Sequence, residues 1–341
     1  MRGAGTNHGR SGRATMVDVA EAAGVSLKTV SRVINAEPGV RPSTVEKVME
    51  AVRALRYERN DLAASLRHGA RSFTLGLIIE DVANPFYSAI AQAVEERARE
   101  RSSLLITASA REDPHREREL VTALLRRRVD ALLVVPAGAD HRYIRDAGFS
   151  TQFVFLDRPP AKTKADAVLV ENAAGARRAV SHLMERGHER IAFVGDYLQL
   201  FTARERLLGY RRALGRVGIE PDPILVSVSN STSEDARQTV SELMALPRER
   251  RPTAIFAGNN RCTVGALHAL DGKRKRVALV GFDDFELAGL LGVTVVRTDP
   301  YRMGLLGAEL AFDRIDGDER DPQRLMVPAE LVERGSGEIR P

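Results

Sequence analysis

The sequence predicts an α/β protein with an all-α helix-turn-helix head and two doubly wound parallel lobes. Two short helical patterns separated by a glycine lie within residues 15–35. From Phe73 onwards, short apolar runs alternate with amphipathic helical patterns, as in parallel sheets covered by helices. A length of 341 residues with 43% hydrophobic residues suffices for a small module and a large core that splits in two.

The charge distribution divides the chain at the same place. Residues 1–72 contain 12 Lys/Arg and 7 Asp/Glu, whereas residues 73–341 contain 39 of each, so the net charge of +5 lies in the N-terminal fifth. A basic head on a neutral body favours nucleic acid as the partner of the head. Residues 1–14, rich in Gly, Ser and Arg, are predicted to be a disordered basic arm, with entry into a DNA groove as the alternative.

Several classes of protein are disfavoured by composition. Cys262 is the single cysteine and cannot form an intrachain disulfide, and no Cys/His cluster has the spacing of metal ligands. No apolar run approaches the ~20 residues of a membrane span, and the N-terminus lacks the apolar core of a signal peptide. We therefore expect a cytoplasmic protein without a metal or cofactor and without contact with a membrane.

Two short helices joined by a tight turn are predicted after the arm. Thr15 and Asp18 have the spacing of a capping box at the start of the first helix. Gly24 is predicted to end this helix, because glycine adopts the left-handed backbone conformation at little cost. Ser26 is suited to cap a second helix over about 27–35, through the free amides of its first turn.

The second helix is predicted to have one buried and one outward face. Val30, Val33 and Ile34 recur at the spacing of a buried stripe. Long donors and small hydroxyls on the other face fit a DNA major groove, where Arg binds guanine and an apolar side chain contacts the thymine methyl. These outward residues are Leu27, Lys28, Ser31, Arg32 and Asn35. The pattern is typical of a recognition helix, and an ordinary helical hairpin is the alternative.

Residues 17–35, Val-Asp-Val-Ala-Glu-Ala-Ala-Gly-Val-Ser-x-x-Thr-Val-Ser-Arg-Val-Ile-Asn, resemble the N-terminal signature of the lactose-repressor/galactose-repressor (LacI/GalR) family of bacterial transcription regulators. The match is long and ungapped. By position, the resemblance implies that Leu27, Lys28 and Arg32 read base edges. It also implies that three further side chains hold phosphates, namely Thr29, Ser31 and Asn35.

A third helix is predicted from Pro42, and it completes a DNA-binding head over residues 15–57. Its predicted buried stripe consists of Val45, Val48, Met49, Val52 and Leu55. Arg41 stands where the family usually has Ser or a similar cap. We therefore expect either a weaker helix cap or an Arg that contacts phosphate.

Residues 58–72 are too short to form a stable helix in isolation. The resemblance implies a hinge that orders only on DNA, where two copies pair across the axis of a dimer. Leu66 matches the leucine that enters the minor groove at the operator centre and bends the duplex. Asn60 and Ala63 belong to the same predicted interface. A plain linker whose Leu66 packs on the body is the alternative.

Strands and helices alternate through the body, and two such runs imply two lobes. Strands are predicted at 73–79, 104–107, 131–135, 153–156, 168–170, 191–194, 224–228, 254–256 and 277–280. Helices are predicted at 87–101, 116–128, 141–147, 174–185, 202–216, 233–245 and 262–270.

The family resemblance extends over residues 15–336 and implies a body, 73–341, similar to periplasmic sugar-binding proteins. Three crossovers near 171, 298 and 326 would join its two lobes. The predicted N-lobe comprises 73–171 plus 299–326, and the predicted C-lobe comprises 172–298 plus 327–341. The strongest matches are Asn-Pro-Phe-Tyr (84–87), Leu-Asp-Arg-Pro (156–159), Arg-Gly-His-Glu-Arg-Ile-Ala-Phe-Val-Gly (186–195), Val-Gly-Phe-Asp-Asp (280–284) and Pro-Ala-Glu-Leu-Val-Glu-Arg-Gly-Ser (328–336).

Ligands of such sheets bind beyond the carboxyl ends of the strands. Aromatic, carboxylate, amide and guanidinium groups follow these ends here, and this combination suits a polyhydroxylated ring. The resemblance implies that Phe86 and Tyr87 stack on an effector. The other predicted effector-binding residues are Asp157, Arg158, Arg206, Asn259 and Asp283. A sugar or sugar derivative is the expected effector, and a purine-like ligand is the alternative because the aromatics also accept flat rings.

The sequence departs from the family pattern at Asn260, where Asp is common, and at Thr298, where Gln is frequent. Both departures leave the identity of the effector open. The predicted function is a homodimeric DNA-binding regulator of a palindromic operator, most simply a repressor, switched by its effector. An enzyme with a fused head is the rival, but no strand is followed by Gly-x-Gly-x-x-Gly or a P-loop.

Overall fold

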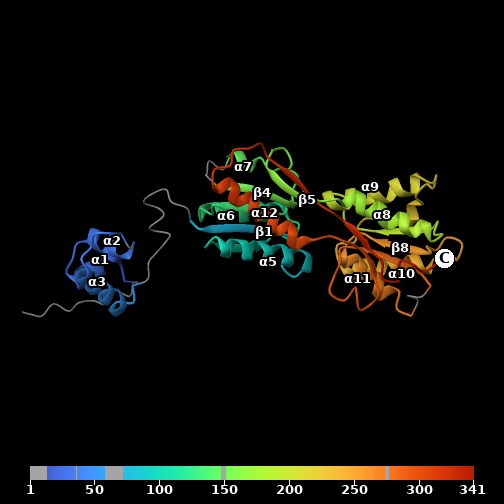
Figure 1. The fold of residues 1–341 in the computed structure, drawn as a ribbon. Helices are drawn as coiled ribbons and strands as arrows, with labels where there is room; N and C mark the ends of the chain where they lie inside the picture. Colours follow the sequence, from blue (N-terminus) through green and yellow to red (C-terminus); the bar gives the residue numbers. More distant parts are fainter. Residues whose placement is uncertain (1–13, 36, 58–71, 147–150, 273–275) are drawn as a thin grey trace, which may run out of the picture. The chain divides into compact units, whose positions relative to one another are not determined.

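A computed structural model of the chain describes residues 14–35, 37–57, 72–146, 151–272 and 276–341. The chain divides into two compact units, residues 1–70 and 71–341, which hold the helical head and the α/β body (Figure 1). Nearly all of the predicted arm and hinge lie outside the described residues, and so do Asn60, Ala63 and Leu66. Within the described part, no helix is long and apolar enough to cross a membrane.

The head consists of three helices, α1 (Met16–Ala23), α2 (Leu27–Ile34) and α3 (Pro42–Ala54). The predicted capping box is confirmed, because the amide of Thr15 donates to Asp18 Oδ2 at 2.7 Å and the amide of Asp18 donates to Thr15 Oγ1 at 3.4 Å. Gly24 ends α1 with φ +63°. Ser26 Oγ accepts the amide of Thr29 at 3.2 Å and so caps α2.

The core of the head is small. It consists of Val19, Ala20, Val30, Val48 and Ala51, with Val33 and Ile34 partly buried against it. The prediction that Met49 and Leu55 are buried is wrong, since they are 39% and 37% exposed. The reason is that α1 and α2 span only eight residues each and cover a narrow stripe of α3. As expected, Arg41 gives α3 no side-chain cap.

The N-lobe contains a six-stranded sheet in the order β2-β1-β3-β4-β5-β11, and every neighbouring pair is parallel. Helices cover both faces: Leu133 packs in one cluster with α5 and α12, whereas Leu132 packs in another with α6 and α7. The strands are β1 (Thr74–Ile79), β2 (Leu104–Ser109), β3 (Ala131–Val134), β4 (Gln152–Asp157), β5 (Asp166–Val170) and β11 (Arg324–Val327). The helices are α5 (Pro85–Glu100), α6 (Pro114–Arg126), α7 (Tyr143–Asp146) and α12 (Pro300–Ile315).

The C-lobe repeats this plan with the order β7-β6-β8-β9-β10-β12. One face of its sheet packs on α8 and α9, and the other packs on α10 and α11. The strands are β6 (Ile191–Val194), β7 (Val226–Ser227), β8 (Ala254–Ala257), β9 (Ala278–Phe282), β10 (Thr294–Arg297) and β12 (Glu330–Val332). The helices are α8 (Asn172–Glu185), α9 (Phe201–Gly215), α10 (Ser233–Ala245) and α11 (Asn260–Ala269).

The C-lobe differs from the prediction in three details, and the first is that β10 and β12 were not predicted as strands. The strand predicted at 224–228 is only Val226–Ser227, because Asp222 caps a 3-10 turn over Pro223–Leu225. The lobe is also not wholly parallel, since β12 runs antiparallel to β10. The chain enters β12 directly from the end of β11 in the other lobe. It therefore reaches the C-lobe sheet at the carboxyl ends of the parallel strands and runs back in the opposite direction.

The two lobes are joined by three stretches of chain, between β5 and α8, between β10 and α12, and between β11 and β12. The last third of the sequence therefore contributes α12 and β11 to the N-lobe. Figure 1 shows this directly, because the red α12 lies among the cyan and green elements of that lobe. The carboxyl ends of the strands in both lobes carry the residues that line the central cavity.

Candidate functional site

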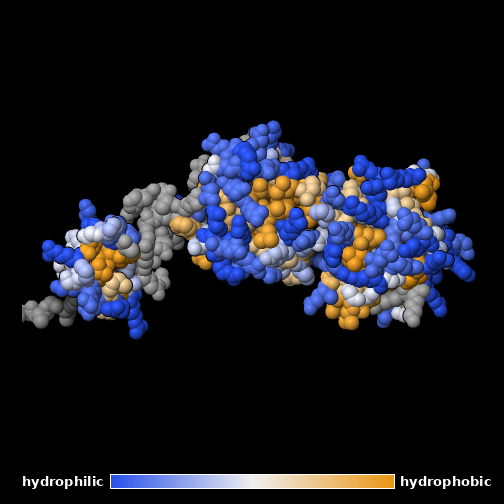
Figure 2. All heavy atoms as spheres, in the orientation of Figure 1, coloured by the Kyte–Doolittle hydropathy of each residue, from blue (hydrophilic) through white to orange (hydrophobic). Residues whose placement is uncertain are grey.

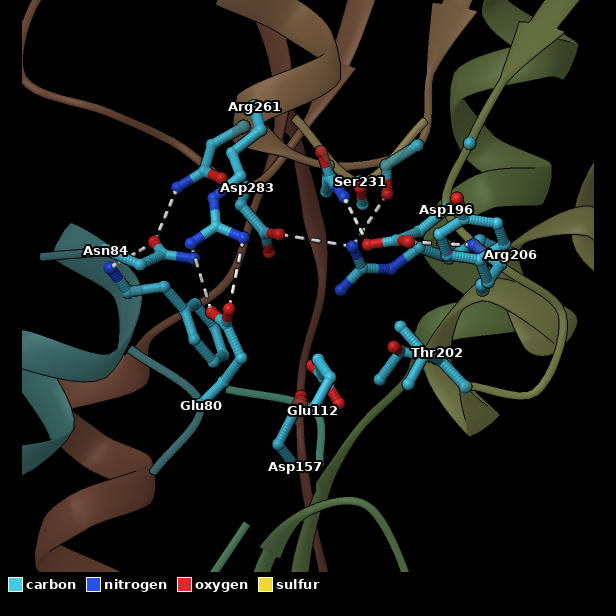
Figure 3. Close-up of a pocket in the computed structure, with 18 of the residues that line it drawn as sticks. Glu80, Asn84, Glu112, Asp157, Asp196, Thr202, Arg206, Ser231, Arg261 and Asp283 are labelled. Atoms are coloured by element: carbon cyan, nitrogen blue, oxygen red, sulfur yellow. Dashed lines mark hydrogen bonds and ion pairs between the residues drawn. The ribbon is translucent and has the colours of Figure 1, made fainter. Parts of the chain in front are cut away.

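A cavity of about 360 Å³ lies between the lobes of the body (Figure 3). All seven residues predicted to bind an effector line it, namely Phe86, Tyr87, Asp157, Arg158, Arg206, Asn259 and Asp283. Five charged residues that the sequence reasoning missed also line it, namely Glu80, Arg111, Glu112, Asp196 and Arg261. The cavity lies at the small end of the about 300–1,000 Å³ typical of small-molecule sites.

The N-lobe wall is built around Arg158, which is buried. Its two terminal nitrogens donate to the two carboxylate oxygens of Glu112, both at 2.5 Å, and Nη1 also donates to the Pro136 carbonyl at 2.8 Å. Nη2 reaches the Tyr87 hydroxyl at 3.3 Å, and that hydroxyl donates to Asp157 Oδ2 at 3.4 Å. Tyr87 is thus held by its hydroxyl as well as by its ring.

One acceptor and one donor remain unused in this wall. Within the described residues, Asp157 Oδ1 and Arg158 Nε are buried and have no hydrogen-bond partner. Arg158 Nε lies 3.6 Å from Asp157 Oδ2, beyond hydrogen-bonding distance. Because a buried polar group without a partner costs free energy, such a pair is suited to receive a polar ligand.

The C-lobe wall is built around Arg206, and its hydrogen bonds are more complete. Its Nε donates to Asn172 Oδ1 at 2.7 Å, while Nη1 donates to the Gly258 carbonyl at 2.7 Å and to Asp283 Oδ2 at 3.1 Å. The guanidinium also lies over the ring of Phe282, 3.8 Å from its centroid.

Thr298 completes the C-lobe wall. Its Oγ1 donates to Asp283 Oδ1 at 3.2 Å, so both oxygens of that carboxylate are used. Thr298, which departs from the family pattern, therefore holds the Asp283 carboxylate in place. Asn172 was missed by the sequence reasoning because it stands at the start of α8, where a polar residue is ordinary.

Asp157 and Asp283 occupy equivalent places in the two lobes. β4 and β9 are each the fourth strand from the corresponding edge of their sheets, Asp157 ends β4, and Asp283 follows β9. Both have left-handed backbones, with φ +64° and +67°. Non-glycine residues are rarely held in this conformation, and such strain is concentrated at functional sites. Burial raises the pKa of both carboxyl groups, while Arg158 and Arg206 oppose the shift at Asp157 and Arg206 opposes it at Asp283.

The remaining predicted side chains lie at two helix starts. Asn259 caps α11 by accepting the amide of Cys262 at 2.8 Å, and its Nδ2 reaches Asp196 Oδ2 at 3.4 Å. Phe86 lies in the first turn of α5, and its ring meets that of Tyr87 edge to face at 5.1 Å. Both residues are mostly buried, at 8% and 6% exposed, so their rings offer a ligand only small areas for the predicted stacking.

In the head, the predicted outward face of α2 is only partly free. Leu27, Lys28 and Asn35 are exposed, and Thr29 and Ser31 are half-buried. Arg32 is held by the turn after α2, because its Nη2 donates to the Pro38 carbonyl at 2.6 Å and its Nε lies 3.4 Å from Glu37 Oε2. No local pattern in the sequence indicates these contacts.

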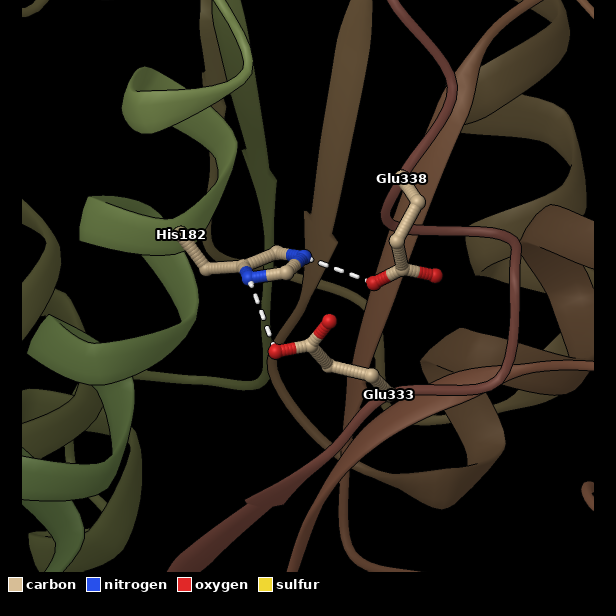
Figure 4. Close-up of side chains that lie close together, drawn as sticks. All are labelled: His182, Glu333 and Glu338. Atoms are coloured by element: carbon tan, nitrogen blue, oxygen red, sulfur yellow. Dashed lines mark hydrogen bonds and ion pairs between the residues drawn. The ribbon is translucent and has the colours of Figure 1, made fainter.

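A second cluster, His182 with Glu333 and Glu338, lies outside the cavity (Figure 4). The two ring nitrogens face different carboxylates: Nε2 lies 2.7 Å from Glu338 Oε1, and Nδ1 lies 3.8 Å from Glu333 Oε1. Glu338 also accepts from the Thr294 hydroxyl and the Gly335 amide. Because both ring nitrogens and the Glu338 carboxylate already have protein partners, we assign this cluster a structural role.

Comparison with known proteins agrees with both parts of this description. Residues 15–60 match the family model "Bacterial regulatory proteins, lacI family", and residues 180–337 match a periplasmic binding protein-like domain. The chain is 33% identical to the ribose operon repressor of Escherichia coli (strain K12) over 335 residues, which cover 95% of this chain and 99% of that repressor.

Two solved structures show the same arrangement of elements. One is a complex of the transcriptional regulator CelR with cellobiose, 31% identical, with a TM-score of 0.70 and coverage of 95% of this chain and 100% of that one. The other is the lac repressor dimer bound to operator and an anti-inducer, 26% identical, with a TM-score of 0.81 and coverage of 96% and 99%.

Proposed function

Because the chain belongs to the lacI family of bacterial regulatory proteins, and is therefore a DNA-binding transcriptional regulator rather than an enzyme, we propose that its effector is a neutral sugar bound between the lobes. The observation that carries this proposal is the unused acceptor and donor at Asp157 Oδ1 and Arg158 Nε. A hydroxyl both donates and accepts, so neighbouring sugar hydroxyls match an acceptor and a donor on adjacent residues.

The charge of the cavity supports a neutral ligand. Among the described residues that line it are five carboxylates and four guanidinium groups, which nearly cancel. Three of the four arginines, Arg158, Arg206 and Arg261, already have carboxylate partners. A phosphorylated ligand would therefore meet few free positive charges. The solved CelR structure contains a disaccharide, which adds support for a sugar in this architecture.

The head is proposed to bind DNA through α2, with Leu27, Lys28 and Arg32 at the bases and Thr29, Ser31 and Asn35 at phosphates. Two heads of a homodimer would bind the two half-sites of a palindromic operator. Effector binding would change the arrangement of the lobes and so the affinity for operator, by a coupling of about 1–3 kcal/mol. A regulator of bacterial DNA acts where the DNA is, so we place the protein in the cytoplasm.

The effector class is tested by thermal unfolding of the full-length protein with sugars, sugar phosphates and nucleobases. We expect a neutral sugar to raise the midpoint, because a ligand that binds only the native state stabilises it by mass action. The Asp157→Asn variant should lose this shift, since its amide has a single oxygen, which the Tyr87 hydroxyl uses, and so keeps no free acceptor for the ligand. A shift with nucleobases alone would support the purine-like alternative, and a shift with sugar phosphates alone would contradict a neutral ligand.

Exposed apolar side chains on both lobes support the homodimer, and Figure 2 shows hydrophobic patches on each. Leu104 of the edge strand β2 is 74% exposed, and Leu290 in the loop after β9 is 84% exposed beside the exposed Leu287 and Leu291. We expect Leu290→Glu to weaken dimerisation in sedimentation velocity, because it places a charge in an apolar contact. Val217→Glu, at a position 59% exposed on the C-lobe, is the matched control. Equal dimerisation of both variants would remove Leu290 from the interface.

A further inference from the structure

The first turn of α11 in the C-lobe reaches across the cavity to the N-lobe. Arg261 Nη1 and Nη2 donate to Glu80 Oε1 and Oε2 at 3.1 and 3.2 Å, a two-pronged ion pair, and Nη2 also reaches Asp81 Oδ2 at 3.3 Å. Glu80 and Asp81 directly follow β1, so these bonds join the end of a strand in the N-lobe to the first turn of α11 in the C-lobe (Figure 3).

A second bond lies beside the first. Asn260 Nδ2 donates to Asn84 Oδ1 at 2.9 Å, and the same oxygen accepts the amide of Phe86 at 3.2 Å where Asn84 caps α5. The start of α11 is thus tied to the start of α5. We call Arg261, Asn260, Glu80, Asp81 and Asn84 together the latch.

The bonds of the latch join the two lobes and contribute no contact within either lobe. Within the described residues, the Arg261 guanidinium bonds only to Glu80 and Asp81, and the Asn260 amide nitrogen bonds only to Asn84. Glu80 is 9% exposed and the Arg261 side chain 31%, so the pair is shielded from solvent more than a surface ion pair. All of these bonds join protein atoms directly.

The latch also forms part of the wall around the cavity. Glu80, Asn84, Asn260 and Arg261 all line it, so a ligand that extends between the lobes in their direction must break the latch. The volume of about 360 Å³ inside this boundary lies near the lower end of the range for ligand sites.

We propose that the latch holds the lobes together without an effector, and that Arg261 thereby restricts the cavity to a ligand the size of a single sugar ring. The restriction rests on the proposed sugar effector, whereas the closure does not. A latch made only of protein groups shifts the equilibrium between open and closed lobes towards the closed form before any ligand arrives. The effector then binds a conformation that is already populated.

Closure is tested by the distance between spin labels on Cys introduced at Glu119 of α6 and Gln238 of α10. Both positions are exposed, and Cys262 is fully buried and so protected from labelling. The full-length protein, mixed with excess unlabelled chain to isolate distances within one protomer, is measured without sugar. We expect Arg261→Gln and Glu80→Gln each to lengthen and broaden the distance distribution.

The control for closure is Arg297→Gln, which removes an exposed ion pair with Glu330 inside the C-lobe, 3.2 Å long. It should leave the distances unchanged. Distances in both latch variants equal to those of the unmodified protein would overturn the latch. This outcome does not depend on which ligand the protein binds.

Size restriction is tested with the monosaccharide that gives the largest thermal shift and a disaccharide that contains the same ring. The unmodified protein should prefer the monosaccharide at least tenfold. In Arg261→Gln the monosaccharide should bind several-fold more weakly, because less of the protein is closed. The affinities for the monosaccharide and the disaccharide should become nearly equal. The same preference in both proteins would overturn the role in size restriction. If no sugar binds, the proposed effector fails, while the label distances still decide the latch.

Discussion

Asp283→Asn is expected to lower the free energy of unfolding of the body by about 3–5 kcal/mol and to abolish the effector response. The substitution leaves the buried Arg206 guanidinium without its counter-charge, which is the costly way to break a buried ion pair. Asparagine tolerates the left-handed backbone at this position, so the loss reports the charge and not the strain. Urea unfolding followed by circular dichroism measures the stability, and operator affinity with and without effector measures the response.

Asp157→Asn is the matched control, because it makes the same chemical change at the equivalent place in the other lobe. Asp157 has an unpaired oxygen, and burial raises the pKa of its carboxyl group. In the folded protein this group stays protonated to a higher pH than in the unfolded chain. Stability therefore falls as pH rises from the unfolded pKa to the folded one.

In the Asp157→Asn variant, this loss of stability with rising pH is absent, because asparagine does not titrate. The variant should gain stability relative to the unmodified protein as pH rises through this window, and the two should converge below it. It should still lose the effector response. A loss of stability as large as that of Asp283→Asn would contradict the difference in pairing between the two carboxylates.

Arg32→Ala is expected to weaken binding to the cognate operator by about 1–3 kcal/mol, with a much smaller loss on random DNA. A base contact contributes only where the correct base is present, whereas phosphate contacts contribute on any sequence. Arg32 must leave Pro38 and Glu37 to reach a base, so its intramolecular bonds lower the net gain. Fluorescence anisotropy with both DNAs at one salt concentration measures the difference.

Arg53→Ala removes the same charge from an exposed position on α3 and is the control for the loss of general attraction. It should weaken both complexes slightly and to a similar extent. The melting temperature of the head should be recorded for both variants, because Arg32 also fastens the turn after α2. Equal losses on the two DNAs for Arg32→Ala would refute its role in reading bases.

The fold was largely predictable as far as β9 because each of these strands and helices has its own local pattern, whereas β10, α12, β11 and β12 were not predicted. Capping at Thr15 and Ser26, and the alternation through the body, depend on residues close together in the sequence. The errors have non-local causes. The direction of β12 depends on which lobe the chain has just left, and the exposure of Met49 depends on how much of α3 its short partners cover.

The site was predictable to about the same extent as the fold. The rule that ligands meet strand ends identifies Asp157 and Asp283. Glu112 was missed because it lies in a loop after β2, where a charged residue is ordinary, and it meets Arg158 only once β2 and β4 share a sheet. Arg261 was missed for a similar reason, since its partners belong to the other lobe and no periodicity in the sequence relates them.

The three connections between the lobes set the order in which a growing chain becomes a regulator. The sheet of the N-lobe is complete only when β11, at Arg324–Val327, leaves the ribosome, so neither lobe can finish folding early in synthesis. The head depends on none of these later residues for its core. A ribosome that stops within the body therefore releases a fragment that has its DNA-binding head but lacks the lobes that hold the effector, and the cell must remove such fragments to keep control of the operator.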